Sequence, residues 1–145
     1  VYLTQNLPSY VSAFGGANSR SDAEGFLGNL QTKIFHANGD PVTNNWAADS
    51  IGKTRQAQFY AGLSDSNAGT GAVTNQNAGG SMVVEYVVQP QEFTMLRTGG
   101  PECGFLVDSI IFQGGRRWVT AQRGKPVAQN HLRHVFPQRY LDTGA

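Results

Sequence analysis

The stretch TKIFHANGDPVTNNWAADSIG, residues 32–52, carries the clearest structural signals of the chain. Its first four residues, Thr32–Phe35, suit a short strand. Asp40 is a residue type that caps a helix N-terminus, Pro41 fits the first helical position, and Gly52 fits the position just past a helix end. The stretch therefore predicts a short strand followed by a well-bounded helix.

The residues before this stretch follow the same order. Val1–Thr4 is a short apolar run that suits a strand, and Leu7–Ser9 favours the start of a helix that Gly15 and Gly16 would end. Asp22–Leu30 has a helical pattern. Alternating strands and helices are typical of an α/β layer with parallel strands, so we expect that architecture for residues 1–64.

The second half of the chain has a different pattern. Residues 65–80 are rich in Gly, Asn, Ser and Ala, which predicts a flexible loop. After this loop, strand-like segments separated by glycine turns predict antiparallel strands and hairpins: Met82–Val88, Phe105–Phe112, Trp118–Ala121 and Leu132–Phe136. We therefore expect one partial domain over residues 1–145, divided into 1–64, 65–80 and 81–145.

Composition limits the classes of protein to which the chain can belong. It has 145 residues, 39% of them hydrophobic, and a formal net charge of +1, which gives no overall case for a nucleic-acid or membrane-surface protein. Cys103 is the single cysteine, so no internal disulfide forms. No apolar run approaches the roughly 18–20 residues that span a bilayer, and the N-terminus lacks a signal-peptide pattern. We expect a soluble chain.

Two candidate sites fail on their context. Ala47–Thr54 ends like a phosphate-binding P-loop, but Ala47 replaces the first glycine and the motif closes a helix, whereas a P-loop opens one. His131 and His134 lie three apart, which puts them on opposite faces of a strand, and Cys103 alone cannot complete a zinc site. The sequence therefore predicts neither a phosphate cradle nor a metal centre.

Charge is concentrated near the C-terminus. From Gly114 onward there are six Lys or Arg against one acid. A cluster with Trp118 interleaved offers the candidate contacts with nucleic acid or a neighbouring subunit: Arg116, Arg117, Arg123 and Lys125. The other interpretation is a solvated hairpin face, because charges on strands usually lie at the surface.

Several segments together resemble the TraG/TraD-like coupling ATPases of conjugation and type IV secretion. Gly28–Lys53 is similar to the stretch after that family's Walker B strand, and VYLTQNLPSY at residues 1–10 is similar to its next strand, which ends in glutamine. Pro90–Gly100 fits the family's P-x-x-F-x-x-L-x-x-GG segment, and Phe136–Gln138 resembles its closing F-x-Q. The resemblance spans nearly the whole chain.

The resemblance implies a fold and a set of site residues. The fold would be α/β, the C-terminal part of a RecA-like P-loop NTPase domain followed by antiparallel strands. Gln5 would occupy the position that senses the γ-phosphate of ATP, with Asn6 as a weaker second candidate. Related motors place an arginine finger just before the helix that begins at Pro41, but this chain has Asn38–Asp40 there. Lys33 or Arg55 would be the substitutes.

The resemblance also leaves two functions open. The parent protein would be a hexameric motor that uses ATP and Mg²⁺ to move DNA or secretion substrates, and it would work in the cytoplasm while anchored to the bacterial inner membrane. This chain lacks the Walker A and Walker B motifs, so we expect no ATP binding or hydrolysis by it alone. The alternative is a non-catalytic docking module that recognises a relaxosome accessory protein or a secretion substrate. The isolated fragment would self-associate, for instance as a dimer, and this segment would not contact the membrane.

Overall fold

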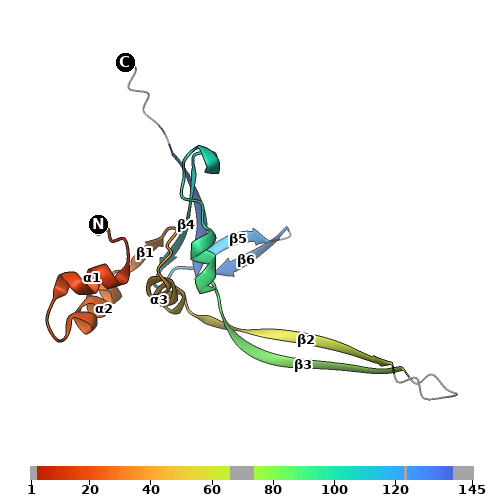
Figure 1. Cartoon of the computed structure of the whole chain (residues 1–145). Coiled ribbons are helices and arrows are strands. Elements are labelled where there is room, and N and C mark those ends of the chain that lie inside the picture. Colours follow the sequence, from red (N-terminus) through yellow and green to blue (C-terminus); the bar gives the residue numbers. More distant parts are fainter. Residues whose placement is uncertain (1–2, 66–73, 123, 139–145) are drawn as a thin grey trace.

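The structure is a computed structural model that describes residues 3–65, 74–122 and 124–138. Its helices are α1 (Leu7–Phe14), α2 (Ser19–Asn29) and α3 (Pro41–Ile51), with 3-10 helices η1 (Pro90–Met95) and η2 (Pro101–Cys103). Its strands are β1 (Thr32–Phe35), β2 (Lys53–Asp65), β3 (Thr74–Tyr86), β4 (Leu106–Gln113), β5 (Trp118–Gln122), β6 (Lys125–Gln129) and β7 (His131–Pro137). Figure 1 shows how they are arranged.

The predicted boundaries of α1 and α3 are confirmed by their caps, whereas α2 begins at Ser19, three residues before the predicted Asp22. Asn6 Oδ1 accepts a hydrogen bond from the Ser9 N–H at 2.8 Å at the start of α1. Asp40 Oδ2 accepts from the Thr43 N–H at 2.9 Å and from the Thr43 hydroxyl at 2.5 Å at the start of α3. Gly52 follows α3 with a φ of 106°, in the region that favours glycine. Local sequence is therefore sufficient to set the ends of these helices.

The prediction of parallel strands is wrong. All strand pairs in the described residues are antiparallel, and the central sheet has the order β1-β4-β7. A helix after a strand brings the next strand back parallel only if that strand joins the same sheet. Here the chain leaves α3 along β2, which pairs with β3 instead, and β4 then runs beside β1 in the opposite direction. The described residues thus lack the parallel sheet that is typical of a RecA-like P-loop NTPase domain, and the predicted fold is wrong.

The first predicted strand is not found in the described part of the chain. Leu3 and Thr4 lie outside any helix or strand, and Val1 and Tyr2 fall outside the described residues. Thr4 instead bonds locally, its hydroxyl donating to Asn6 O at 3.0 Å. The next predicted strand, Thr32–Phe35, is confirmed as β1.

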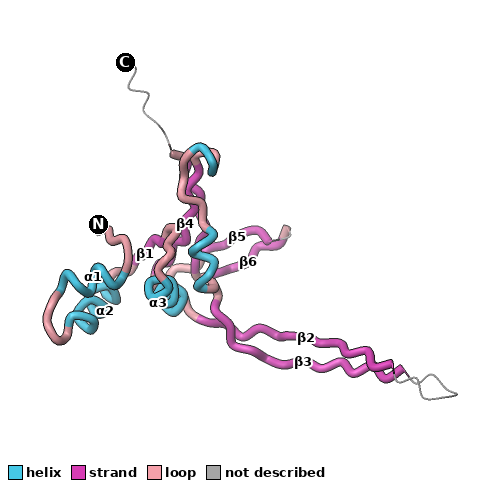
Figure 2. The backbone as a smooth tube through the Cα atoms, viewed as in Figure 1, coloured by secondary structure: helices cyan, strands magenta, loops and turns pink. Residues whose placement is uncertain are grey.

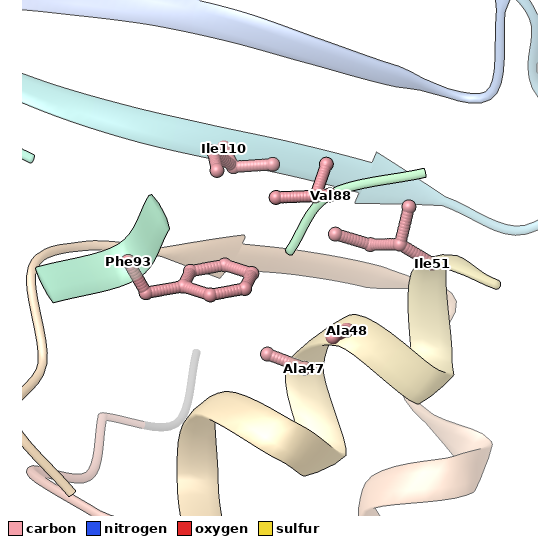
Figure 3. Close-up of a cluster of buried hydrophobic side chains, with 6 residues drawn as sticks. All are labelled: Ala47, Ala48, Ile51, Val88, Phe93 and Ile110. Carbon is pink, nitrogen blue, oxygen red and sulfur yellow. The ribbon is translucent and has the colours of Figure 1, made fainter. Parts of the chain in front are cut away.

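The hydrophobic core lies between α3, η1 and one face of the central sheet. Ala47, Ala48 and Ile51 of α3 pack with Val88, Phe93 and Ile110, all of them buried. Figure 3 shows these side chains converging from the helix, from η1 and from β4. Burying each of the larger side chains contributes about 1.5–3 kcal/mol relative to leaving it exposed.

Two hairpins extend from this core, and they confirm the antiparallel second half. β2 and β3 form a long arm, paired in register from Lys53↔Tyr86 to Asp65↔Thr74 (Figure 2). The predicted loop 65–80 is therefore shorter than expected, because Asp65 and residues 74–80 belong to the arm, while residues 66–73 lie outside the described part. β5 and β6 form the second hairpin.

Among the described residues, no helix is long and apolar enough to cross a membrane.

Candidate functional site

A pocket of about 460 Å³ lies between the N-terminal segment, β1 and α3. Most of its wall is apolar, and several polar side chains also line it. The apolar lining residues include Leu27, Leu30, Phe35, Trp46 and Phe93, and the polar ones include Gln5, Asn6, Asn38, Thr43 and Asn44. A concave, mainly apolar wall with a few polar groups is the usual form of a binding site.

The pocket follows the edge of β1. Six consecutive residues, Thr32 to Ala37, line it. Successive side chains of a strand point to opposite faces, so a pocket that touches every residue of the strand runs along its backbone edge. Leu3 to Asn6 line the same pocket, and Thr43 and Asn44 line it from α3.

Asn38 lines the pocket and forms four hydrogen bonds with the chain around it. Its Nδ2 donates to Gln5 O at 2.8 Å, and its Oδ1 accepts from the Asp40 N–H at 2.8 Å. Its carbonyl accepts from Asn44 Nδ2 at 2.8 Å, and its own N–H donates to Phe93 O at 3.2 Å. Asn38 stands where the resemblance would put an arginine finger, and here it fixes three chain segments to one another.

Lys33 is the only Lys, Arg, Asp or Glu among the described residues that line the pocket. Its Nζ donates to Leu30 O at 2.7 Å, and burial lowers the pKa of this ammonium. His36 also lines the pocket, and its Nδ1 donates to Asp108 O across 3.1 Å. The described lining therefore provides one cation and no carboxylate, whereas Mg²⁺-triphosphate sites use a lysine together with oxygen ligands for the metal.

Gln5 and Asn6 both line the pocket, in different ways. The side chain of Asn6 caps α1, so its amide oxygen is engaged in a hydrogen bond with the Ser9 N–H. The Gln5 side chain is exposed, and the residue precedes a helix instead of ending a strand. Sequence reasoning thus selected two residues of the pocket while predicting a different local structure for them.

The predicted basic cluster lies on the β5–β6 hairpin and the turn before it. The Arg116 guanidinium lies 4.1 Å from the centroid of the Trp118 ring and donates to Gln113 Oε1 at 3.3 Å. Arg117 and Lys125 are exposed. Arg123 lies outside the described residues. Its described members, Arg116, Arg117 and Lys125, do not line the pocket, so the described site residues predicted from the sequence form two separate groups.

Two of the motifs quoted for the resemblance contact each other. Gln138 Oε1 accepts from the Gly100 N–H at 2.8 Å, and the Gln138 N–H donates to Phe105 O at 2.7 Å. Gly99 has a φ of 89°, and a Cβ there would lie 2.5 Å from the Gln138 side chain. The glycine pair of the first motif thus makes room for the glutamine of the second, which is a structural role.

The sequence did not predict that two other residues, Trp46 and Phe93, would line the same pocket. Trp46 and Phe93 each pack edge-on against Phe35, with centroid distances of 5.9 and 5.7 Å. They come from α3 and η1, which are far apart along the chain, so no local pattern links them. Only the topology brings them to the same wall.

The described residues hold no group of three His, Cys, Asp or Glu side chains that could bind a metal ion. Comparisons with protein-family models, with curated proteins and with solved structures found no match.

Proposed function

We propose that this chain is a non-catalytic docking module of a coupling protein in conjugation or type IV secretion, and that it recognises a relaxosome accessory protein or a secretion substrate. The observation that carries the proposal is the pocket along β1, whose described lining is mainly apolar and contains a single cation and no carboxylate. Such a wall suits the side chains of a polypeptide better than the phosphates of ATP.

The remaining expectations from the resemblance form part of the same proposal. The parent protein assembles as a hexamer, binds ATP and Mg²⁺ through residues outside this chain, and is anchored to the bacterial inner membrane. The docking module itself lies in the cytoplasm, where accessory proteins and substrates are available. Gln5 then acts at the rim of the docking pocket in this chain.

A binding measurement with a matched pair of variants tests the proposal. The purified chain is titrated with the accessory protein and with the secretion substrates of its own transfer system. Gln5→Glu adds a carboxylate at the pocket rim, and Gln91→Glu adds the same group at an exposed position in η1. We expect the first variant to change affinity at least about fivefold, roughly 1 kcal/mol, and the second to leave it unchanged.

Two results would contradict the docking function. One is the absence of binding to every protein of the transfer system. The other is steady Mg²⁺-dependent ATP turnover by the purified chain that disappears in Gln5→Ala, because a chain with that activity would be a motor and not a docking module.

DNA contact is a second candidate function, and the β5–β6 hairpin favours it. Residues 114–130 contain four Lys or Arg and no acid, and Arg116, Arg117 and Lys125 are all exposed. Phosphate contacts make DNA affinity depend on salt, with a slope near 0.9 per contact in a double-logarithmic plot. Arg117→Ala and Lys125→Ala should each lower that slope by about one contact. Lys53→Ala serves as control, since Lys53 is paired with Asp49 at 3.2 Å.

A further inference from the structure

Within the described residues, the backbone of β1 has one edge without a partner strand. In the described residues β1 pairs with β4 on one side only, and it forms an outer edge of the sheet. Leu3 and Thr4 pass nearby in the pocket wall, but neither belongs to a strand, and the backbone of neither bonds to β1. A strand with one free edge is a template for another strand.

The hydrogen-bond phase of the sheet identifies the backbone groups at that edge. Gly114 N–H donates to Gln31 O at 3.0 Å, so these two residues form a hydrogen-bonded pair in the antiparallel register. Bonded and non-bonded pairs alternate, which turns the N–H and C=O of Lys33 and Phe35 toward β4. The N–H and C=O of Ile34 therefore point away from β4, toward the free edge.

The same alternation places side chains above and below the edge. Phe35 and Lys33 lie on the face that carries the core, and Ile34 lies on the other face with 51% of its side chain exposed. A strand added beside β1 would send alternate side chains toward Trp46 and Phe93, which line the pocket on the core face. Those side chains must be apolar.

The charge of the pocket specifies one further feature of the occupant. The Lys33 ammonium lies on the core face with Leu30 O as its one described hydrogen-bond partner. An ammonium has three donors, so two remain for a ligand. A carboxylate on the same face of the added strand would pair with Lys33 in a partly buried setting, where charge-assisted hydrogen bonds are stronger than neutral ones.

We propose that the free edge of β1 binds an extended segment of a partner protein by β-strand addition, with alternating apolar side chains and one carboxylate facing the pocket. This inference rests on the proposed docking function and names how the partner is held. Backbone hydrogen bonds to Ile34 hold the segment, and the pocket selects its side chains.

A second copy of this chain is a weaker occupant. β1 has four residues and is about 13 Å long. Two copies joined edge to edge through β1 would share only this short contact, whereas stable dimers bury about 1,200–2,000 Å² or more. A flexible segment that also fills the pocket does not depend on a large rigid contact.

Ile34→Pro tests the edge directly. Proline removes the outward N–H of Ile34 and leaves the bonds of Lys33 and Phe35 to β4 intact, and proline is tolerated on an edge strand with this orientation. Val135→Pro makes the same change in β7, on the opposite edge of the sheet. Ile34→Val keeps the N–H. Circular dichroism and thermal unfolding verify that each variant is folded.

The probe is the blocked hexapeptide acetyl-Thr-Val-Thr-Val-Thr-Asp-amide, titrated by calorimetry. Its valines and aspartate share one face, as the core-side wall requires. We expect Ile34→Pro to weaken binding at least about tenfold relative to wild type and to Ile34→Val, while Val135→Pro changes it less than about twofold. Two isomeric peptides, N-methylated at the third or at the fourth residue, should differ at least about tenfold, since only alternate amides face β1.

Equal binding of the two methylated isomers, or equal binding to the Ile34→Pro and Val135→Pro variants, would overturn strand addition at β1. The outcome separates this inference from the docking function. An accessory protein that binds wild type and Ile34→Pro equally leaves the docking function standing and overturns the edge. A hexapeptide that binds with the alternating pattern, when no transfer protein binds, supports the edge and overturns the docking function.

Discussion

β1 and β7 are the two edges of one three-stranded sheet, and they are protected to different degrees. The bond from the Gln138 N–H to Phe105 O at 2.7 Å fixes the phase of β7. By alternation, the backbone groups of Arg133, Val135 and Pro137 face outward. Pro137 has no N–H to offer there, and Arg133 forms an ion pair with Glu92.

β1 lacks both protections along its free edge. Its outward backbone positions are those of Thr32 and Ile34, which carry no charge. Lys33 is the one charged residue of β1, and it is directed to Leu30 O. Natural sheets use charge and proline to prevent unwanted pairing. The contrast indicates that β7 is closed to a further strand and that β1 is open to one.

The comparison of β1 with β7 requires that both edge strands belong to one sheet with one hydrophobic core. Ile110 lies in the central strand β4 and is 0% exposed, while Ile34 on the β1 edge is 51% exposed. We expect Ile110→Ala to lower the free energy of unfolding by about 2–5 kcal/mol and Ile34→Ala by about 1 kcal/mol or less. Urea unfolding measures both. Equal losses would mean that the edge residue is packed as deeply as the centre.

How much of this comparison the sequence could predict depends on the range of the signals. The caps at Asn6 and Asp40 act over three residues, so α1 and α3 could be located from local patterns. The limits of β1, Thr32–Phe35, could also be predicted, because the four residues form a local strand-like run. The pairing of β1 with β4 joins Thr32 to Gln113, and no local pattern encodes which of the later strands arrives, or in which direction.

The pocket was predictable only in part. The resemblance points to Gln5 and Asn6, and it offers Lys33 as a substitute for an arginine finger. Trp46 lies in α3, and Phe93 reaches the same wall only because the chain returns to the core at η1 after the long β2–β3 arm. The full length of the β2–β3 arm could not be predicted, because residues 74–80 of β3 are rich in Gly and Asn and have the composition of a loop.

The end of β7 offers the next largest effect. Gly99→Ala would hold a non-glycine residue at a φ of 89° and displace the Gln138 side chain, which then loses its bond to the Gly100 N–H. We expect a loss of about 1–3 kcal/mol in the free energy of unfolding. Gly25→Ala in α2 is the control, since nothing lies near its Cβ position, and it should stabilise by about 0.5–1 kcal/mol. A neutral Gly99→Ala variant would show that β7 does not depend on this closure.

His131 gives the β7 edge a dependence on pH. It is 7% exposed, and burial, together with the nearby positive charge of Arg133, lowers its pKa below the usual value of 6.5. The unfolded chain then binds the proton more tightly, so stability is greatest above pH 6.5 and falls as pH decreases through the lower folded pKa. Urea midpoints at pH 7.5 and pH 5.5 should differ less in His131→Gln than in wild type. An unchanged difference would exclude His131 as the source.

Removal of the β7 charge should produce the smallest effect. Arg133→Val eliminates the ion pair with Glu92 and leaves an apolar edge. We expect weak self-association at high protein concentration, visible as a modest rise in average mass by sedimentation, because Pro137 still interrupts the edge. Self-association as strong in wild type as in Arg133→Val would show that the charge gives β7 no protection.

Amide hydrogen exchange at Ile34 and Val135 tests the central claim most directly. Both N–H groups face outward, one at each edge of the same sheet, so each is the internal control of the other. With saturating accessory protein or secretion substrate bound, the account predicts that exchange at Ile34 slows at least about tenfold while exchange at Val135 does not change. Unchanged exchange at Ile34 in the bound state, or protection at Val135 instead, would contradict it.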